Sequence, residues 1–262
     1  QKMEKNKVIE KFFIKVEPPV LGNGVLYFVV TGKNMDEVLE QISLVGEPFL
    51  VVPCIGGVTI CSIVIKENLD QKIELAKKLL NKKNSIFGSC WGLQVLVTAA
   101  GGKIQKNPNG LEAIVAKNIS LNEEGVKHPM YYGKSKTFDS FCFHYDDIEI
   151  LPENTTILAS NEKSKIQAIS FTNENSQVWA VQYHPEFDPV WMSGLMNQRE
   201  KLLLDEGIYS NQEEFDSYKS YFSNIELLND QKILLNISDN LINQKMHTLE
   251  LSNWLNFLKN KD

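Results

Sequence analysis

Short apolar runs alternate with amphipathic stretches along the first hundred residues of the chain. The apolar runs predict strands at 12–16, 25–30, 49–54 and 85–87. Helical spacing of apolar residues predicts helices between and after them, at 34–44, 68–82 and 91–99. This exchange of strands and helices is typical of an α/β protein with a mainly parallel central sheet.

The middle and the end of the chain follow different patterns. From Glu112 to Val181, β-rich segments separated by polar turns predict antiparallel additions to the sheet. Beyond Pro189 the pattern is helical, with helices expected at about 191–205, 213–224 and 240–259. We therefore expect one domain over residues 1–205 and a helical C-terminal extension over residues 206–262.

The last expected helix carries an apolar stripe formed by Leu251, Trp254, Leu255 and Leu258. Such a stripe is more typical of core packing than of a cofactor site. We expect it to pack the extension on the domain or on a neighbouring copy. A homodimer is therefore left open.

Composition narrows the class of protein. The 262 residues are 43% hydrophobic and 23% charged, as in ordinary folded proteins. The formal net charge is -6 and Arg199 is the one arginine, which argues against nucleic acid and anionic membranes as partners. The apolar runs fall short of the ~20 residues that a membrane helix needs. The cysteine spacings match neither a zinc motif nor a disulfide scaffold, so we expect a cytoplasmic protein with reduced thiols and no metal.

The most informative segment runs from Ser85 to Gln94, where an apolar strand meets a Gly-x-Cys-x-Gly pattern and then a helix. A nucleophile on such a tight turn needs small neighbours, and Gly88 and Gly92 would supply that room. The thiol of Cys90 would lie at a helix N-terminus, which favours the thiolate. A buried cysteine between two turn glycines is the alternative.

A second segment favours the chemical interpretation. The strand expected at 178–182 ends in His184-Pro185-Glu186. A cysteine nucleophile needs an imidazole to exchange protons, and the imidazole needs a third group to orient it. The histidine and the glutamate could supply both functions from one strand end.

Together the two segments resemble a known family. Gly88-Ser-Cys-Trp-Gly-Leu-Gln94, followed far downstream by Gln182-Tyr-His-Pro-Glu186, resembles the class I, or triad, glutamine amidotransferases. The chain looks most like stand-alone proteins similar to the amidotransferase domain of GMP synthase. The resemblance implies a three-layer, flavodoxin-like α/β fold with helices on both sides of the sheet and the active site at the carboxyl ends of its strands.

The resemblance also implies roles for individual residues. Cys90 would be the nucleophile, His184 the general base and acid, and Glu186 the residue that orients the imidazole. The backbone N–H of Trp91 would form half of an oxyanion hole. The other half is expected at Gly56-Gly57, a glycine pair after the strand at 49–54.

For other positions the sequence indicates a role less specifically. Gln94 matches a position that helps to hold the substrate, with a glutamine on an exposed helix surface as the alternative. His144 could line the site, although a structural role in a β segment is at least as well supported. His128 and His247 show no partner pattern and are expected to face solvent.

The function implied is hydrolysis of the glutamine side-chain amide through a cysteine thioester, giving glutamate and ammonia. No organic cofactor is needed, because a thiol, an imidazole and a carboxylate suffice. A synthetase partner could accept the ammonia, since no ATP-binding motif is visible in the chain. One alternative is a hydrolase of other γ-glutamyl amides or peptides. A second alternative is a regulatory subunit that has lost efficient catalysis.

Overall fold

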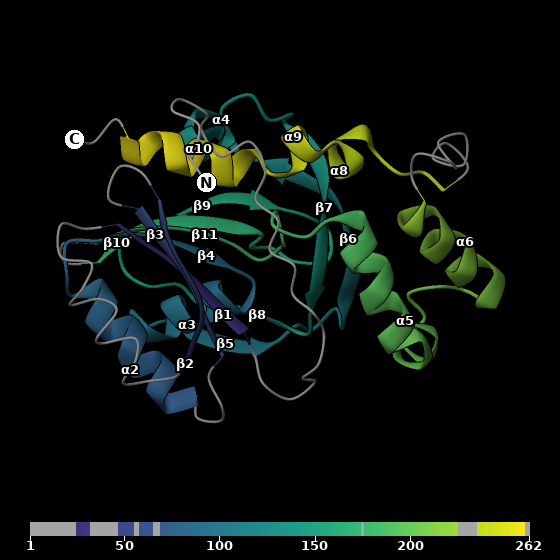
Figure 1. Cartoon of the computed structure of the whole chain (residues 1–262), viewed down its shortest axis with the longest axis horizontal. Coiled ribbons are helices and arrows are strands. Elements are labelled where there is room, and N and C mark those ends of the chain that lie inside the picture. Colours follow the sequence, from purple (N-terminus) through teal and green to yellow (C-terminus); the bar gives the residue numbers. More distant parts are fainter. Residues whose placement is uncertain are drawn as a thin grey trace, which may run out of the picture.

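The computed structural model describes residues 25–31, 47–54, 58–64, 69–173, 176–224 and 235–259 (Figure 1). For the first three of these ranges it describes the backbone. The strand expected at 12–16, the helix expected at 34–44 and the Gly56-Gly57 pair lie outside the described residues.

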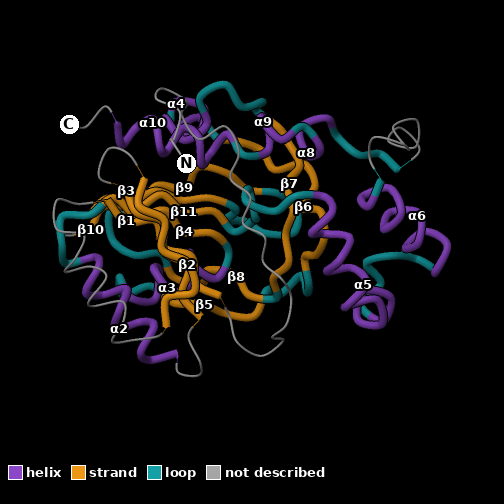
Figure 2. The backbone as a smooth tube through the Cα atoms, viewed as in Figure 1, coloured by secondary structure: helices purple, strands orange, loops and turns teal. Residues whose placement is uncertain are grey.

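The described strands form two sheets (Figure 2). The larger, curled sheet has the order β2-β3-β1-β4-β11-β10-β9-β6-β7, and β5 pairs with β8 in the smaller one. The strands are β1 (Val25–Thr31), β2 (Glu47–Cys54), β3 (Val58–Val64), β4 (Ser85–Ser89), β5 (Lys103–Lys106), β6 (Glu112–Leu121), β7 (Thr137–His144), β8 (Asp146–Ile150), β9 (Thr155–Ser160), β10 (Ala168–Asn173) and β11 (Ser176–Val181).

The sheet is mixed, which corrects the expectation of a mainly parallel one. Among the described strands, β4 and β11 form the one parallel pair, and the other pairs are antiparallel. The reason lies in the connections. Strands such as β10 and β11 follow one another closely and pair as hairpins, whereas a parallel pair needs a long crossover, as between β4 and β11.

The helices are α2 (Leu69–Leu80), α3 (Trp91–Ala99), α4 (Glu123–Lys127), the 3-10 turn η1 (Pro129–Tyr131), α5 (Pro189–Asp205), α6 (Gln212–Ser223), α8 (Asp239–Ile242), α9 (Gln244–His247) and α10 (Leu249–Lys259). Helices α2 and α3 lie on one side of the sheet and α10 on the other (Figure 1). Gly101, with φ 89°, follows the end of α3 in the left-handed conformation that terminates helices.

Successive residues of the two central strands, β4 and β11, point to opposite faces of the sheet, and each face forms a separate hydrophobic core with helices. Ile86 of β4 and Ala180 of β11 pack in a core with α2 and α3. Phe87 and Trp179, their neighbours along the chain, point to the opposite face and pack in a second core with Trp254 of α10. This period of two follows from strand geometry and confirms the three-layer α/β architecture.

A third core joins α5, α6 and α8 to β6 and β7. Phe141 of β7 is fully buried there and meets Phe222 of α6 edge to face, with ring centroids 5.5 Å apart. Figure 1 shows α5 and α6 standing beside the end of the sheet that contains β6. The helical C-terminal part of the chain is thus tied to the sheet at two places.

The helix expected at 240–259 is divided into α8, α9 and α10. Asn243 accepts hydrogen bonds from the backbone of Lys245 and Met246, so it caps α9 and separates it from α8. The apolar stripe of α10 packs in the core as expected, with Trp254 only 1% exposed. The domain division at residue 205 stays a prediction. Within the described ranges, no helix combines the length and apolar character of a membrane span.

Candidate active site

The turn between β4 and α3 places Cys90 at the edge of the sheet. Cys90 has φ 47° and ψ −105°, an unusual conformation for a residue other than glycine, and such strain often marks functional sites. Its backbone N–H donates to Val181 O at 2.8 Å, and its carbonyl accepts from Gln94 N at 3.2 Å. The first bond holds the cysteine beside the carboxyl end of the parallel strand β11.

Of the two glycines around the cysteine, Gly88 lies where neighbouring atoms leave little room for a side chain. A Cβ atom there would lie 2.7 Å from Leu96 Cδ1 and 3.0 Å from Leu93 N, so the Leu96 side chain would have to shift to admit it. A Cβ at Gly92 would meet none of the described atoms within 4 Å. The structure therefore supports the expected need for room at Gly88 and gives no such reason for Gly92.

The imidazole and carboxylate expected to act together do lie together. His184 Nδ1 is 2.7 Å from Glu186 Oε1, and each side chain is 14% exposed. The backbone N–H of His184 donates to Phe141 O at 2.7 Å, which ties the segment after β11 to β7. Burial alone would lower the pKa of His184, but the negative charges of Glu186 and Cys90, with hydrogen bonds to both, raise that pKa to about 10.

An aromatic stack covers one face of the His184 ring. The ring of Phe187 lies parallel to the imidazole, with centroids 3.9 Å apart and planes inclined by 5°. The ring of Trp191, in the first turn of α5, lies against Phe187 with centroids 3.8 Å apart and planes inclined by 33°. The stack restricts rotation of the imidazole and keeps Nδ1 directed at the carboxylate.

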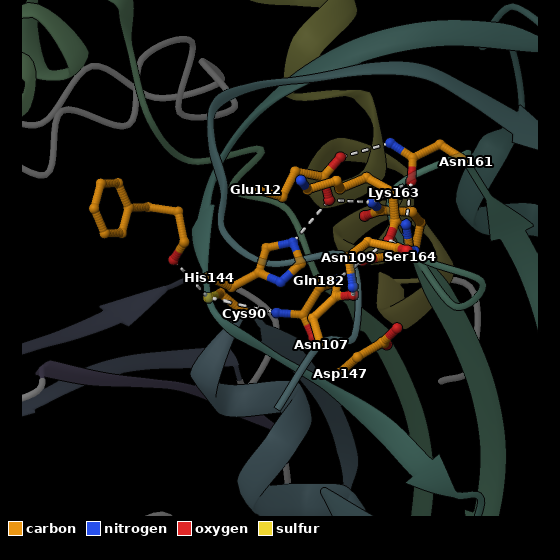
Figure 3. A network of polar contacts seen from close by, with 12 residues as sticks. Cys90, Asn107, Asn109, Glu112, His144, Asp147, Asn161, Lys163, Ser164 and Gln182 are labelled. Atoms are coloured by element: carbon orange, nitrogen blue, oxygen red, sulfur yellow. Dashed lines mark hydrogen bonds and ion pairs between the residues drawn. The ribbon is translucent and has the colours of Figure 1, made fainter. Parts of the chain in front are cut away.

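The Cys90 thiol lies among polar groups of three elements (Figure 3). Sγ is 3.6 Å from Gln182 Nε2 and 3.7 Å from Phe143 O of β7. Gln94 Nε2 is 3.4 Å from Gln182 Oε1, so the two amides form a chain that ends at the sulfur. Gln94 is only 7% exposed, which excludes the exposed helix surface as its place.

Trp91 is the first residue of α3, where backbone N–H groups have no intrahelical acceptor. This is the place that an oxyanion donor would need. The ammonium of Lys72, from α2, lies 4.0 Å above the centroid of the Trp91 indole ring. Burial lowers the pKa of Lys72. The second expected donor, at Gly56-Gly57, lies outside the described residues.

His144 lies next to Phe143 but belongs to a closed polar network (Figure 3). Its Nε2 is 2.9 Å from Glu112 Oε2, and its Nδ1 is 3.0 Å from Asp146 O. Both ring nitrogens are therefore engaged in structural contacts, and the side chain is only 1% exposed. This geometry favours the structural interpretation of His144 over the site-lining one.

The sequence patterns indicated no role for Ser89, nor for Gln182 and Phe187, which also contact the site. Ser89, the last residue of β4, has its Oγ 2.9 Å and 3.0 Å from the two oxygens of Glu186. The same Oγ is 3.3 Å from His184 Nδ1. The position before the cysteine is variable in the Gly-x-Cys-x-Gly pattern, so the motif itself carries no signal for it.

Two further observations bear on chemistry. The described cysteines Cys90 and Cys142 are both free thiols. Within the described part of the chain, no group of three or more histidine, cysteine, aspartate or glutamate side chains has the arrangement of a metal site. The polar side chains described at the strand ends are the Cys90 thiol, the His184 imidazole, the Glu186 carboxylate, the Ser89 hydroxyl and the amides of Gln94 and Gln182.

Comparison with protein families adds the deciding observation. The family model for class I glutamine amidotransferases matches residues 56–195, more than half of the chain. The chain belongs to this family. The matched residues include the β4–α3 turn and the end of β11, where the class I glutamine amidotransferase motifs lie.

Curated relatives of this class I amidotransferase include hydrolases and synthetases. A γ-glutamyl-L-1-hydroxyisopropylamide hydrolase from a Pseudomonas species is 29% identical over 142 residues, 53% of this chain and 48% of that protein. γ-Glutamyl peptidase 5 of Arabidopsis thaliana is 30% identical over 99 residues, 37% of this chain and 39% of the relative. A glutamine-hydrolysing GMP synthase of Thermosipho africanus is 34% identical over 87 residues, 32% of this chain and 15% of the synthase. The chain thus spans about half or less of the length of these relatives.

A solved structure confirms the fold. A glutamine amidotransferase from Thermotoga maritima matches with a TM-score of 0.53 and 17% sequence identity, covering 73% of this chain and 69% of that one. At this identity the similarity concerns the fold alone. The class I amidotransferase fold predicted from the motifs is therefore confirmed.

Proposed function

We propose that this class I amidotransferase hydrolyses γ-glutamyl amide bonds, with Cys90 as nucleophile and an amine larger than ammonia as the preferred leaving group. The observation that carries the proposal is the meeting of two strand ends. The β4–α3 turn presents the Cys90 thiol, and the segment after the parallel strand β11 presents His184 paired with Glu186 at 2.7 Å.

In the proposed mechanism, the Cys90 thiolate attacks the γ-carbonyl carbon of the glutamyl group. The tetrahedral oxyanion receives a hydrogen bond from the backbone N–H of Trp91 at the start of α3. His184, as imidazolium, gives its proton to the departing amine nitrogen when the C–N bond breaks. The His184 imidazole then takes a proton from a water molecule that attacks the thioester, and glutamate leaves with the thiol restored.

The leaving group is inferred from the relatives. The Pseudomonas protein is named for a γ-glutamyl amide and the Arabidopsis protein for γ-glutamyl peptides. Both use an amide bond at the glutamyl γ-carbon, the same bond that is broken in glutamine. The initial expectation of a glutaminase therefore becomes the second candidate, favoured by the family model and by the GMP synthase match. A synthetase partner that accepts ammonia is needed only under that candidate.

The test compares leaving groups on one enzyme. Release of glutamate is measured from γ-glutamyl-p-nitroanilide, from γ-glutamylalanine and from free glutamine, with the purified wild-type chain and Cys90→Ala. We expect kcat/KM for the anilide or the dipeptide to exceed that for glutamine by about tenfold or more. Loss of the thiol should abolish turnover of every substrate, because members of a triad act as a unit.

Each outcome decides between specific alternatives. Faster turnover of glutamine than of either larger amide would replace the proposal with the glutaminase candidate. Hydrolysis by Cys90→Ala at the wild-type rate would exclude the thiol as nucleophile. Cys142→Ser provides the matched control, since Cys142 is fully buried on β7 and should be replaceable without loss of chemistry.

A further inference from the structure

We propose that Ser89 is a positioning residue of the active site, which holds the Glu186 carboxylate in the orientation that His184 needs. The inference deepens the proposed hydrolase and rests on it for the activity measurements. It assigns a role to the residue directly before the nucleophile, a position that the cysteine motif leaves open.

The contacts of the hydroxyl carry the argument. Ser89 Oγ lies 2.9 Å from Glu186 Oε1 and 3.0 Å from Oε2, so its one proton is shared with a charged acceptor. Hydrogen bonds to a carboxylate are roughly twice as strong as neutral ones. Tyr183 O lies 3.1 Å from the same Oγ, but as an uncharged carbonyl it is the weaker acceptor. The structure therefore favours donation from Ser89 to Glu186.

The carboxylate depends on this contact. Within the described part of the chain, the hydrogen-bond partners of the Glu186 side chain are His184 and Ser89. Because Glu186 is partly exposed, water would compete for its oxygens once the serine hydroxyl is removed. The carboxylate would then be held by the imidazole alone, and it could no longer fix the orientation of that ring.

The position of Ser89 explains how one side chain contacts both His184 and Glu186 from the position next to Cys90. Ser89 is the last residue of β4, and it pairs in register with Val181, the last residue of β11. Successive residues of a strand project to opposite sides, so Ser89 and Cys90 leave the same strand end in different directions. The cysteine faces the amide of Gln182, and the serine faces the carboxylate behind the imidazole.

The chain offers a matched control. Ser140 of β7 is also a serine on a strand, 1% exposed, and its Oγ has no hydrogen-bond partner among the described residues. Ser140→Ala removes the same atom as Ser89→Ala but breaks no contact to the triad. Ser89→Thr keeps the hydroxyl and tests for rescue.

The experiment has two readouts on wild type, Ser89→Ala, Ser89→Thr and Ser140→Ala. With γ-glutamyl-p-nitroanilide, we expect Ser89→Ala to lower kcat about tenfold with KM unchanged, the effect of one hydrogen bond to a charged group. Ser89→Thr should recover most of kcat, and Ser140→Ala should match the wild type. The second readout is the far-downfield proton NMR signal of His184 Nδ1–H, identified by its loss in His184→Gln. It should be sharp in the wild type and the threonine variant and broadened by exchange in Ser89→Ala.

The NMR readout needs no substrate, so the two proposals fail in different ways. If the wild type hydrolyses no γ-glutamyl amide but the His184 signal broadens in Ser89→Ala, the proposed function fails and the role of Ser89 stands. An unchanged signal and an unchanged kcat in Ser89→Ala would overturn the role of Ser89. A fall in the melting temperature that threonine does not reverse, with normal kcat and signal, would show that the serine only packs.

Discussion

Two histidine–glutamate pairs lie close to the same thiol, and their surroundings differ. In the first, His184 uses Nδ1 for Glu186 at 2.7 Å, and the same ring interacts with the Cys90 thiol. In the second, His144 uses Nε2 for Glu112 at 2.9 Å and Nδ1 for the carbonyl of Asp146. In the first pair each side chain is 14% exposed, whereas in the second the His144 side chain is 1% exposed and the Glu112 side chain 6%.

The carboxylates differ as much as the rings. Glu112 also accepts hydrogen bonds from Asn161 Nδ2 at 2.6 Å and from Gln167 Nε2 at 2.7 Å, so four polar side chains close on one another. Glu186 has only the imidazole and one serine hydroxyl among its described partners. A histidine–glutamate pair can thus move protons where one ring nitrogen is left without a structural partner, and it stabilises the fold where both are occupied.

The sharpest test of this difference applies one substitution to both histidines. His184→Gln should lower kcat by about a thousandfold or more, because no group then protonates the leaving amine. His144→Gln should keep kcat within a few-fold but lower the free energy of unfolding by about 1–3 kcal/mol, because it leaves buried acceptors unsatisfied. Steady-state kinetics and urea unfolding measure the two effects. A thousandfold loss of kcat in a stably folded His144→Gln would place that residue in the chemistry instead.

The two described thiols extend the comparison from bases to nucleophiles. Burial raises the pKa of Cys142 well above its usual value, whereas Cys90 adjoins the partly exposed imidazole and a helix N-terminus. With iodoacetamide at neutral pH, we expect Cys90 to be alkylated about a hundredfold faster than Cys142. Mass spectrometry of the peptides gives both rates in one sample. Equal labelling of the two cysteines would contradict the assigned difference.

The sequence predicted the features that short motifs carry. The β4–α3 turn, the segment after β11 and the stripe on α10 could be found because each has a local pattern. Ser89 had none, since its role depends on a carboxylate 97 positions away along the chain. The partners of Glu112 likewise come from separate loops that only the folded sheet brings together.

Isolated polar residues were the least predictable. His128 and His247 were expected to face solvent, yet His247 is only 4% exposed and burial lowers the pKa of each to about 4. A histidine inside a polar stretch gives no sign of the side chains that will cover it. The mixed sheet was missed for a related reason, because periodicity shows where strands are but not which of them pair.

The pH dependence of kcat/KM distinguishes the wild-type His184–Glu186 pair from a variant in which a neutral amide replaces the Glu186 carboxylate. Glu186 helps to raise the His184 pKa to about 10, so the alkaline limb of kcat/KM should lie near pH 10 in the wild type. Glu186→Gln removes the negative charge that favours the imidazolium, and the limb should move to lower pH by about one unit or more. The same shift makes a folding prediction. Because the folded pKa exceeds the usual 6.5, the stabilisation from His184 is full below about pH 6.5 and is lost as pH rises through about 10. An alkaline limb that stays in place in Glu186→Gln would separate Glu186 from the proton transfer.

The smallest expected effect concerns the ring stack, which is recorded for His184 and not for His144 among the described residues. Phe187→Leu keeps an apolar side chain but removes the parallel contact of 3.9 Å with the imidazole. Aromatic pairs contribute about 0.5–1.5 kcal/mol beyond burial, so kcat should fall by about three- to tenfold. Phe215→Leu, which alters the edge-to-face pair of Phe215 with Tyr209, is the matched control and should affect stability but not kcat. Equal kcat in the two variants would show that Glu186 and Ser89 alone hold the ring.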